Sequence, residues 1–195
     1  MKDGLETAES VPVLPVNDNE PLLRLLWAEH DFRDGRIWPE AISTSDLEKP
    51  NRGFSVDRQQ LARREIMEAL IEYQRPRAKK PEDKQTPFLA LIASAKVVRE
   101  LEDSNREKPF VVDASPTEAT QHLPANPAHA EIKSAKKCPK SRLNERRQLL
   151  LGALGTPVEF ANYWQSDTGT ARARSYKSVA FKLAARLCEI LVWFR

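Results

Sequence analysis

The chain has 195 residues, of which 41% are hydrophobic and 30% charged, and 31 Lys and Arg against 28 Asp and Glu give a formal net charge of +3. This length predicts one folded domain with a substantial core, and so small a net charge does not by itself indicate a nucleic-acid-binding protein. No apolar run reaches the ~18 residues that cross a bilayer, and none near residue 1 resembles a signal peptide. We therefore expect a cytoplasmic protein.

The composition and order of segments predict one α+β domain with a small antiparallel sheet covered by two or three helices. Residues 1–20 are polar and interrupted by prolines, which is typical of a flexible leader. The α+β domain is expected over residues 21–157, followed by a polar linker over 158–177 and an apolar C-terminal helix over 178–195.

Within the domain, short runs of β-branched and aromatic residues predict strands at Phe54–Val56, Phe88–Ile92, Phe110–Asp113 and Ala128–Ile132. Helices are expected from Leu22 to about His30, from Arg58 to Gln74 after an Asp57 cap with Gln60 completing a capping box, and from a Ser141 cap to about Leu154. Phe88–Leu101 is expected to begin as a strand and to continue in an extended or helical form. Asp34-Gly35 predicts a chain reversal.

Alternation along Ala128–Ile132 places His129 and Glu131 on one strand face. A hydrolase or nuclease would use His129 as its base, Glu131 or Asp113 as its partner and Arg58 or Arg36 to hold an anion. The sequence has no nucleophile elbow, HExxH motif or glycine-rich phosphate loop. Because strand alternation alone produces polar rows, we favour a solvent-facing row and a non-catalytic protein.

The two cysteines, Cys138 and Cys188, lie far apart in the chain, with no CxxC motif and no nearby pair of histidines. This spacing predicts neither a disulfide framework nor a zinc site. We expect no cofactor, no metal and no small-molecule substrate.

Positive charge is concentrated between Lys133 and Arg147, where Glu145 is the one acidic residue. Clustered cations attract the phosphates of nucleic acids, so this basic segment predicts a possible nucleic-acid site. The candidate residues are Lys133, Lys136, Lys137, Lys140, Arg142, Arg146 and Arg147.

The segment from Ser178 to Phe194 is apolar except for Lys182, Arg186 and Glu189, which form a narrow polar stripe at helical spacing. So apolar a helix needs a partner surface, and we expect a protein partner or self-association. A membrane surface is less favoured because the stripe holds few cations. The sequence therefore favours a protein-interaction module, with partner-binding candidates Phe181, Leu187, Leu191, Trp193 and Phe194.

Four short motifs between Phe32 and Leu154 resemble a group of small uncharacterised bacterial proteins. The motifs are Asp34-Gly35-Arg36 with Ala41 shortly after, Phe54-Ser55-Val56-Asp57-Arg58, Phe110-x-Val112, and Pro124-x-Asn126-Pro127-Ala128-His129-Ala130-Glu131-Ile132. The resemblance implies no activity. It does imply that Asp57, Arg58, Asn126, His129 and Glu131 belong to one unit.

Overall fold

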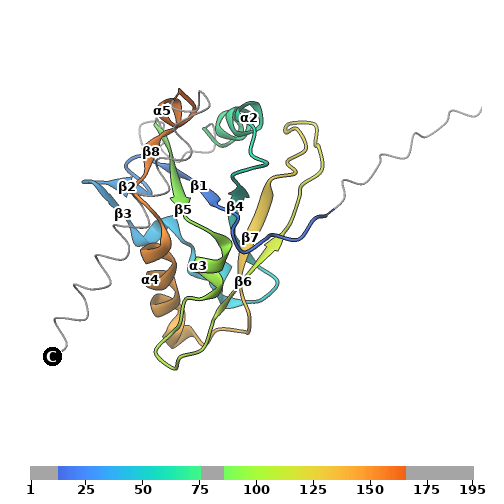
Figure 1. Cartoon of the computed structure of the whole chain (residues 1–195). Helices are drawn as coiled ribbons and strands as arrows, with labels where there is room; N and C mark the ends of the chain where they lie inside the picture. Colours follow the sequence, from blue (N-terminus) through green and yellow to red (C-terminus); the bar gives the residue numbers. More distant parts are fainter. Residues whose placement is uncertain (1–12, 76–85, 166–195) are drawn as a thin grey trace, which may run out of the picture.

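The computed structural model describes residues 13–75 and 86–165, and their arrangement confirms the α+β class (Figure 1). The strands are β1 Leu22–Trp27, β2 Phe32–Arg33, β3 Arg36–Ile37, β4 Gly53–Arg58, β5 Pro87–Ile92, β6 Phe110–Ala114, β7 His129–Ser134 and β8 Val158–Glu159. The helices are α1 Thr44–Glu48, α2 Arg64–Gln74, α3 Ala95–Arg99, α4 Leu143–Ala153 and α5 Phe160–Gln165, with 3-10 turns η1 Pro39–Ala41 and η4 Lys140–Arg142.

Six strands form one antiparallel sheet in the order β6-β7-β4-β1-β5-β8. The expected strands at Phe54–Val56, Phe88–Ile92, Phe110–Asp113 and Ala128–Ile132 are confirmed as β4, β5, β6 and β7. The remaining strands, β2 and β3, pair as a separate hairpin. Asp34 and Gly35 turn this hairpin with φ of 52° and 70°, the left-handed geometry that its tight turn requires.

The expected helix from Leu22 to His30 is wrong, because this run forms β1 near the middle of the sheet. Leu22 and Leu26 lie on one face of β1, while Leu25 and Trp27 face the opposite way, and all four side chains are buried. A strand covered on both faces reads as a continuous apolar run and loses the alternation that would distinguish it from a buried helix.

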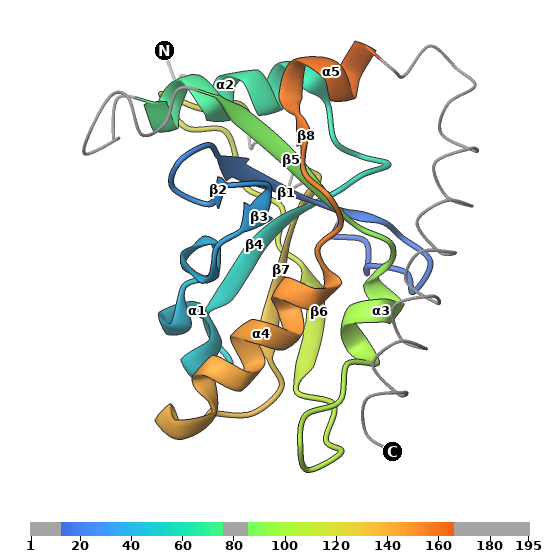
Figure 2. The ribbon, with the colours of Figure 1, turned by 90° about the vertical axis from the view of Figure 1, so that its left-hand side faces the viewer.

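The larger core lies between one face of the sheet and α1, α3 and α4. Figure 2 shows α4 running in front of the strands, with α1 and α3 on either side of it. The buried residues of this core include Leu22, Leu47, Phe54, Val56, Val98, Phe110, Val112, Ala130, Ile132 and Leu150. The sequence predicts four of the elements that hold these residues, β4, β6, β7 and α4, but it does not predict the order of the strands in the sheet.

The second core lies on the opposite face of β1 and β5, under α2 and α5. Its buried residues are Leu25, Trp27, Met67, Ile71, Leu89 and Phe160. Since Phe160 is 7% exposed and β8 pairs with β5, the folded unit continues past Pro157. The expected linker over 158–177 is thus corrected for residues 158–165, and its remainder lies outside the described residues.

Two helix starts also differ from expectation. α2 begins at Arg64 instead of Arg58, because Asp57 and Arg58 stay in β4 to pair with His129 and Leu22. The expected cap at Asp57 therefore does not form. α4 begins at Leu143 after the η4 turn, and its N-cap is Arg142 in place of the expected Ser141.

Part of the expected leader packs against the domain. Arg58 donates from Nε and Nη2 to the Glu20 carboxylate and from Nη1 to the Leu14 carbonyl oxygen, at 2.8–3.2 Å. Arg58 and Glu20 are 4% and 5% exposed, and Val16 is buried beside them. The flexible-leader expectation is therefore wrong for residues 13–20, while residues 1–12 lie outside the described part.

The expected C-terminal helix over 178–195 also lies outside the described residues. Among the helices that are described, none has both the length and the apolar character needed to cross a membrane.

We predict that Arg58→Ala lowers the free energy of unfolding by about 3–5 kcal/mol, because it leaves the Glu20 carboxylate buried without its cation. Amide hydrogens in residues 13–20 should then exchange faster. Urea denaturation and hydrogen exchange measure both effects. Arg64→Ala is the matched control, since its pair with Glu68 is half-exposed and contributes within about 0.5 kcal/mol. Equal losses in the two variants would contradict the role assigned to Arg58.

Candidate functional site

The half of the sheet formed by β4, β7 and β6 has a polar face directed away from the larger core. Alternation places its side chains on that face, and in β7 the burial pattern confirms the alternation that the sequence predicts. The residues of this polar face are Ser55, Asp57, His129, Glu131, Lys133 and Asp113.

Asp57 is the most buried member of the polar face, with 6% exposure. Its Oδ1 accepts a hydrogen bond of 2.8 Å from Nδ2 of Asn126, whose own Oδ1 accepts from the Ala128 N–H at 3.0 Å. Asn126 thereby fixes the end of the 115–128 loop against β4. Burial raises the pKa of Asp57, and the Asn126 hydrogen bond and the charge of His129 only partly oppose that effect.

His129 lies directly opposite Asp57 in the ladder between β7 and β4. Its Nδ1 lies 2.6 Å from the carbonyl oxygen of Ser115. Because a carbonyl oxygen only accepts, Nδ1 carries the proton in this contact, and in a neutral ring Nε2 is then the basic nitrogen. The structure thus brings together Asp57, Asn126 and His129, three of the residues that the motif resemblance groups.

The other expected catalytic partners are committed elsewhere. Glu131 and Asp113 hold Lys133 at 3.1 and 3.5 Å. The Glu131 hydrogen bond is the main cause of the raised Lys133 pKa. Arg58 points to the opposite face, where it binds Glu20, and Arg36 lies exposed in the β2–β3 hairpin. The residues expected for a hydrolase therefore do not converge on His129.

The basic segment 133–147 divides into structural and exposed cations. Lys133 is paired as described, and Arg142 binds Asp103 at 2.7 Å and Glu145 at 3.1 Å. Arg146 is 3% exposed, and Arg147 is half-buried. Lys136, Lys137 and Lys140 are exposed and form no ion pair with a described residue, so these lysines are the candidates that retain free positive charge.

Three loops meet at the end of the molecule that carries these lysines, shown at the bottom of Figure 1. Loop 135–142 is joined to α1 by the Cys138 N–H, which donates to the Glu48 carbonyl oxygen at 3.0 Å. The Ala135 N–H joins the same loop to 100–109 by donating to the Pro109 carbonyl oxygen at 2.8 Å. Loop 49–52 follows α1. We call loops 49–52, 100–109 and 135–142 the basic end.

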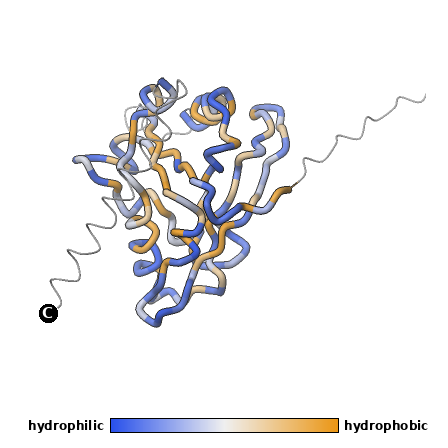
Figure 3. Tube along the Cα trace, in the orientation of Figure 1, coloured by the Kyte–Doolittle hydropathy of each residue, from blue (hydrophilic) through white to orange (hydrophobic). Residues whose placement is uncertain are grey.

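The basic end contains exposed cations that sequence reasoning missed, namely Lys49, Arg52 and Lys108. No charge cluster marks them, because they stand far from the 133–147 segment in the sequence. None of the three loops contains an aromatic residue, and the acidic residues of the basic end all lie in 100–109: Glu100, Glu102, Asp103 and Glu107. Figure 3 shows the chain at this end as mainly hydrophilic.

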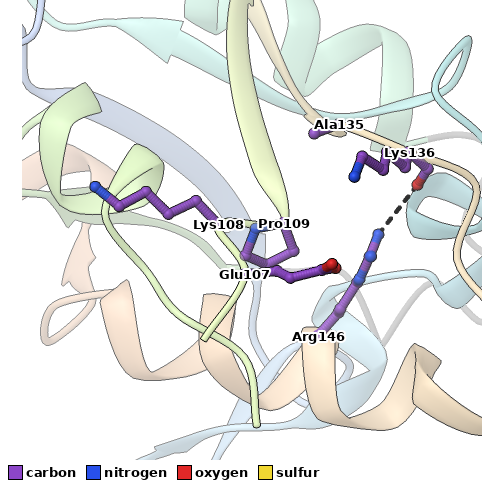
Figure 4. A pocket seen from close by; sticks show the side chains of 6 residues that line it. All are labelled: Glu107, Lys108, Pro109, Ala135, Lys136 and Arg146. Carbon is purple, nitrogen blue, oxygen red and sulfur yellow. Dashed lines mark hydrogen bonds between the residues drawn. The ribbon is translucent and has the colours of Figure 1, made fainter. Parts of the chain in front are cut away.

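A hollow of about 260 Å³ opens at the basic end (Figure 4). It is lined by Glu107, Lys108, Pro109, Ala135, Lys136 and Arg146. Arg146 reaches it from the second turn of α4 and donates from Nη1 to the Lys136 carbonyl oxygen at 3.2 Å. Its Nε is buried without a hydrogen-bond partner.

The structure does not test the partner-binding candidates of the C-terminal helix, and it gathers no metal ligands among the residues it describes. The partner-binding residues expected in the C-terminal helix lie outside the described residues. In residues 13–75 and 86–165, no three His, Cys, Asp or Glu side chains gather as a metal site would require.

Comparison with known proteins yields no match to a protein-family model, a curated protein or a solved structure. The resemblance drawn from the short motifs stays a prediction, and a function has to be argued from the residues themselves.

The raised pKa of Asp57 predicts a pH-dependent effect of Asp57→Asn. The Asp57 carboxyl of the unfolded chain ionises at a lower pH than the same carboxyl in the folded protein. Between these two pKa values the folded state binds more protons than the unfolded state. The contribution of Asp57 to stability therefore falls as the pH rises from the unfolded pKa through the folded pKa. Asn keeps the shape and an oxygen that accepts from Asn126 without the charge. The difference in unfolding free energy, variant minus wild type, should therefore grow with pH and then level off.

Urea denaturation of both proteins between pH 4 and pH 8 measures that difference. A difference that shrinks with rising pH would mean that Asn126 and His129 stabilise the ionised carboxylate more than burial destabilises it. Asp113→Asn, on the exposed part of the polar face, is the control for a general charge effect.

Proposed function

We propose that this chain is a non-catalytic protein whose basic end binds the phosphate backbone of a nucleic acid. The observation that carries the proposal is the convergence of exposed cations from separate loops onto one end of the fold. Lys49 and Arg52 come from 49–52, and Lys136, Lys137 and Lys140 from 135–142. Cations that gather on one surface attract phosphates even when the net charge of the chain is small.

Two of the acidic residues near these cations are neutralised. Asp103 and Glu145 both pair with Arg142. Burial opposes the ionisation of Asp103, but hydrogen bonds from the Glu107 and Asn105 N–H groups and from Arg142 outweigh it and lower the pKa. Both carboxylates therefore stay ionised and bound to Arg142, and Glu107 is the acidic residue that lines the same hollow as Lys136.

The composition of the basic end supports backbone binding over base recognition. Without an aromatic residue its loops offer no surface on which bases could stack. We therefore expect binding to depend strongly on salt and little on sequence.

The alternatives have less support among the described residues. Catalysis at His129 would need an acidic or cationic partner. Among the described residues, Glu131, Asp113 and Arg58 are engaged in other ion pairs, and Asp57, opposite His129, accepts its hydrogen bond from Asn126. The interaction module built on residues 178–195 stays a prediction from sequence. A cytoplasmic location, also a prediction, would give the basic end access to nucleic acids.

We predict that Lys49→Glu/Lys137→Glu/Lys140→Glu abolishes retention of the chain on DNA or RNA at low salt. Loss of three phosphate contacts should reduce the slope of log affinity against log salt by about 2–3. Because all three lysines are exposed and in no ion pair with a described residue, the melting temperature should stay within about 2 °C of wild type.

Arg142 is left unchanged in this variant, since removing it would strip Asp103 of its cation. Arg63→Glu is the matched control, as Arg63 is exposed before α2 at the opposite end of the fold. Wild type that is not retained at low salt, or a triple variant that is retained like wild type, would overturn the proposal.

A further inference from the structure

The hollow at the basic end presents a buried cation that forms no ion pair with a described residue, although the Glu107 carboxylate points toward it across the hollow (Figure 4). Arg146 is 3% exposed, and none of the ion pairs among the described residues includes it. Within those residues its side chain makes the single hydrogen bond to the Lys136 carbonyl oxygen, and Nε makes none. Arginines that are buried normally have a carboxylate beside them, because an uncompensated buried charge is costly.

The groups around Arg146 favour an anionic ligand. Figure 4 shows the side chain of Lys136 directed across the space above Arg146, while the Lys108 ammonium points away from it at the rim. The Glu107 carboxylate is the one acidic group of the lining. Lys136 and Arg146 therefore exceed the one acidic charge that faces the hollow by one, and Lys108 adds a further cation at the rim.

The hollow is also held open by the fold. Asp103 Oδ1 accepts from the N–H groups of Asn105 and Glu107 at 2.9 and 3.1 Å, which fixes the 103–107 turn. Arg142 then links Asp103 to the start of α4, one turn before Arg146. Both walls of the hollow are thus positioned before a ligand arrives, which reduces the entropy lost on binding.

Its size and place limit the ligand. At about 260 Å³ the hollow is smaller than pockets for drug-sized molecules, which start at about 300 Å³. Arginine's planar fork matches the oxygens of a phosphate, and the mouth adjoins the exposed lysines of 135–142. A terminal phosphate monoester carries a charge of about −1.5 to −2 near neutral pH, which suits the excess of cations better than an internal diester does.

We propose that this hollow binds a single phosphate group, and that the group is the terminal phosphate of a nucleic acid bound across the basic end. The choice of a nucleic acid rests on the proposed function, whereas phosphate binding by Arg146, Lys136 and Lys108 does not. A free mononucleotide is the other source of the same chemistry.

The test compares fluorescent oligonucleotides of one sequence that carry a 5′ phosphate, a 3′ phosphate or no terminal phosphate, using fluorescence anisotropy and the full chain. One charge-assisted contact predicts about tenfold or more tighter binding of one phosphorylated form. Arg146→Gln should reduce this preference and leave binding of the unphosphorylated oligonucleotide within about twofold. Lys136→Gln should also reduce the preference, but it should weaken binding of the unphosphorylated oligonucleotide as well, because Lys136 belongs to the backbone-binding cations of the basic end. Glu107→Gln should increase the preference for the phosphorylated oligonucleotide, because a carboxylate that repels the phosphate is removed.

Lys136 and Glu107 are exposed, so these variants keep the test decisive even if Arg146→Gln does not fold. Equal affinity for the three oligonucleotides, unchanged in every variant, overturns the phosphate site while the proposed function stands. Failure to bind any oligonucleotide, together with calorimetric binding of a nucleoside monophosphate that Lys136→Gln weakens, supports the phosphate site and overturns the proposed function. No binding of either ligand overturns both.

Discussion

The register of β7 between β4 and β6 is the constraint on which both functional regions depend. Its core-facing residues, Ala130 and Ile132, are fully buried, so a slip of one residue would drive His129, Glu131 and Lys133 into the core. The end of the strand is fixed as well, because the Ser134 hydroxyl donates to the Leu47 carbonyl oxygen at 2.6 Å. This register places His129 opposite Asp57 and delivers the chain to the basic end at residue 135.

The polar face and the basic end are therefore both positioned by β7, but their charges are paired to different extents. On the polar face, Lys133 bridges Glu131 and Asp113 across two strands and leaves little charge free. Past Ser134 the chain leaves the sheet, and the lysines of 135–142 have no facing acidic strand. The positive charge of Lys133 is compensated within the sheet, whereas Lys136, Lys137 and Lys140 form no ion pair with a described residue, so the loop is the better candidate for an anionic partner.

Strands and turns that depend on neighbouring residues could be predicted from the sequence. Features that depend on contacts between distant residues could not. β-branched and aromatic runs predicted β4, β5, β6 and β7, and Asp34-Gly35 predicted its turn. The sequence wrongly predicts a helix at β1, because a strand buried on both faces shows no alternation. The sequence predicted the 133–147 cations but not that Asp113 and Asp103 neutralise two of them, nor that Lys49 and Lys108 join the others. Those neighbours are set by tertiary contacts that no local pattern encodes.

Arg58 and Arg146 show how burial alone fails to assign a role. Both are at most 4% exposed, so the desolvation cost of each guanidinium is of the same kind. Arg58 uses Nε and both terminal nitrogens on Glu20 and on the carbonyl oxygens of Leu14 and Pro15, and its charge is compensated inside the fold. Arg146 has one carbonyl contact and no acid. An apolar side chain at that position of α4 would avoid the desolvation cost of the guanidinium, whereas a positive charge facing a hollow can attract an anion that enters from outside.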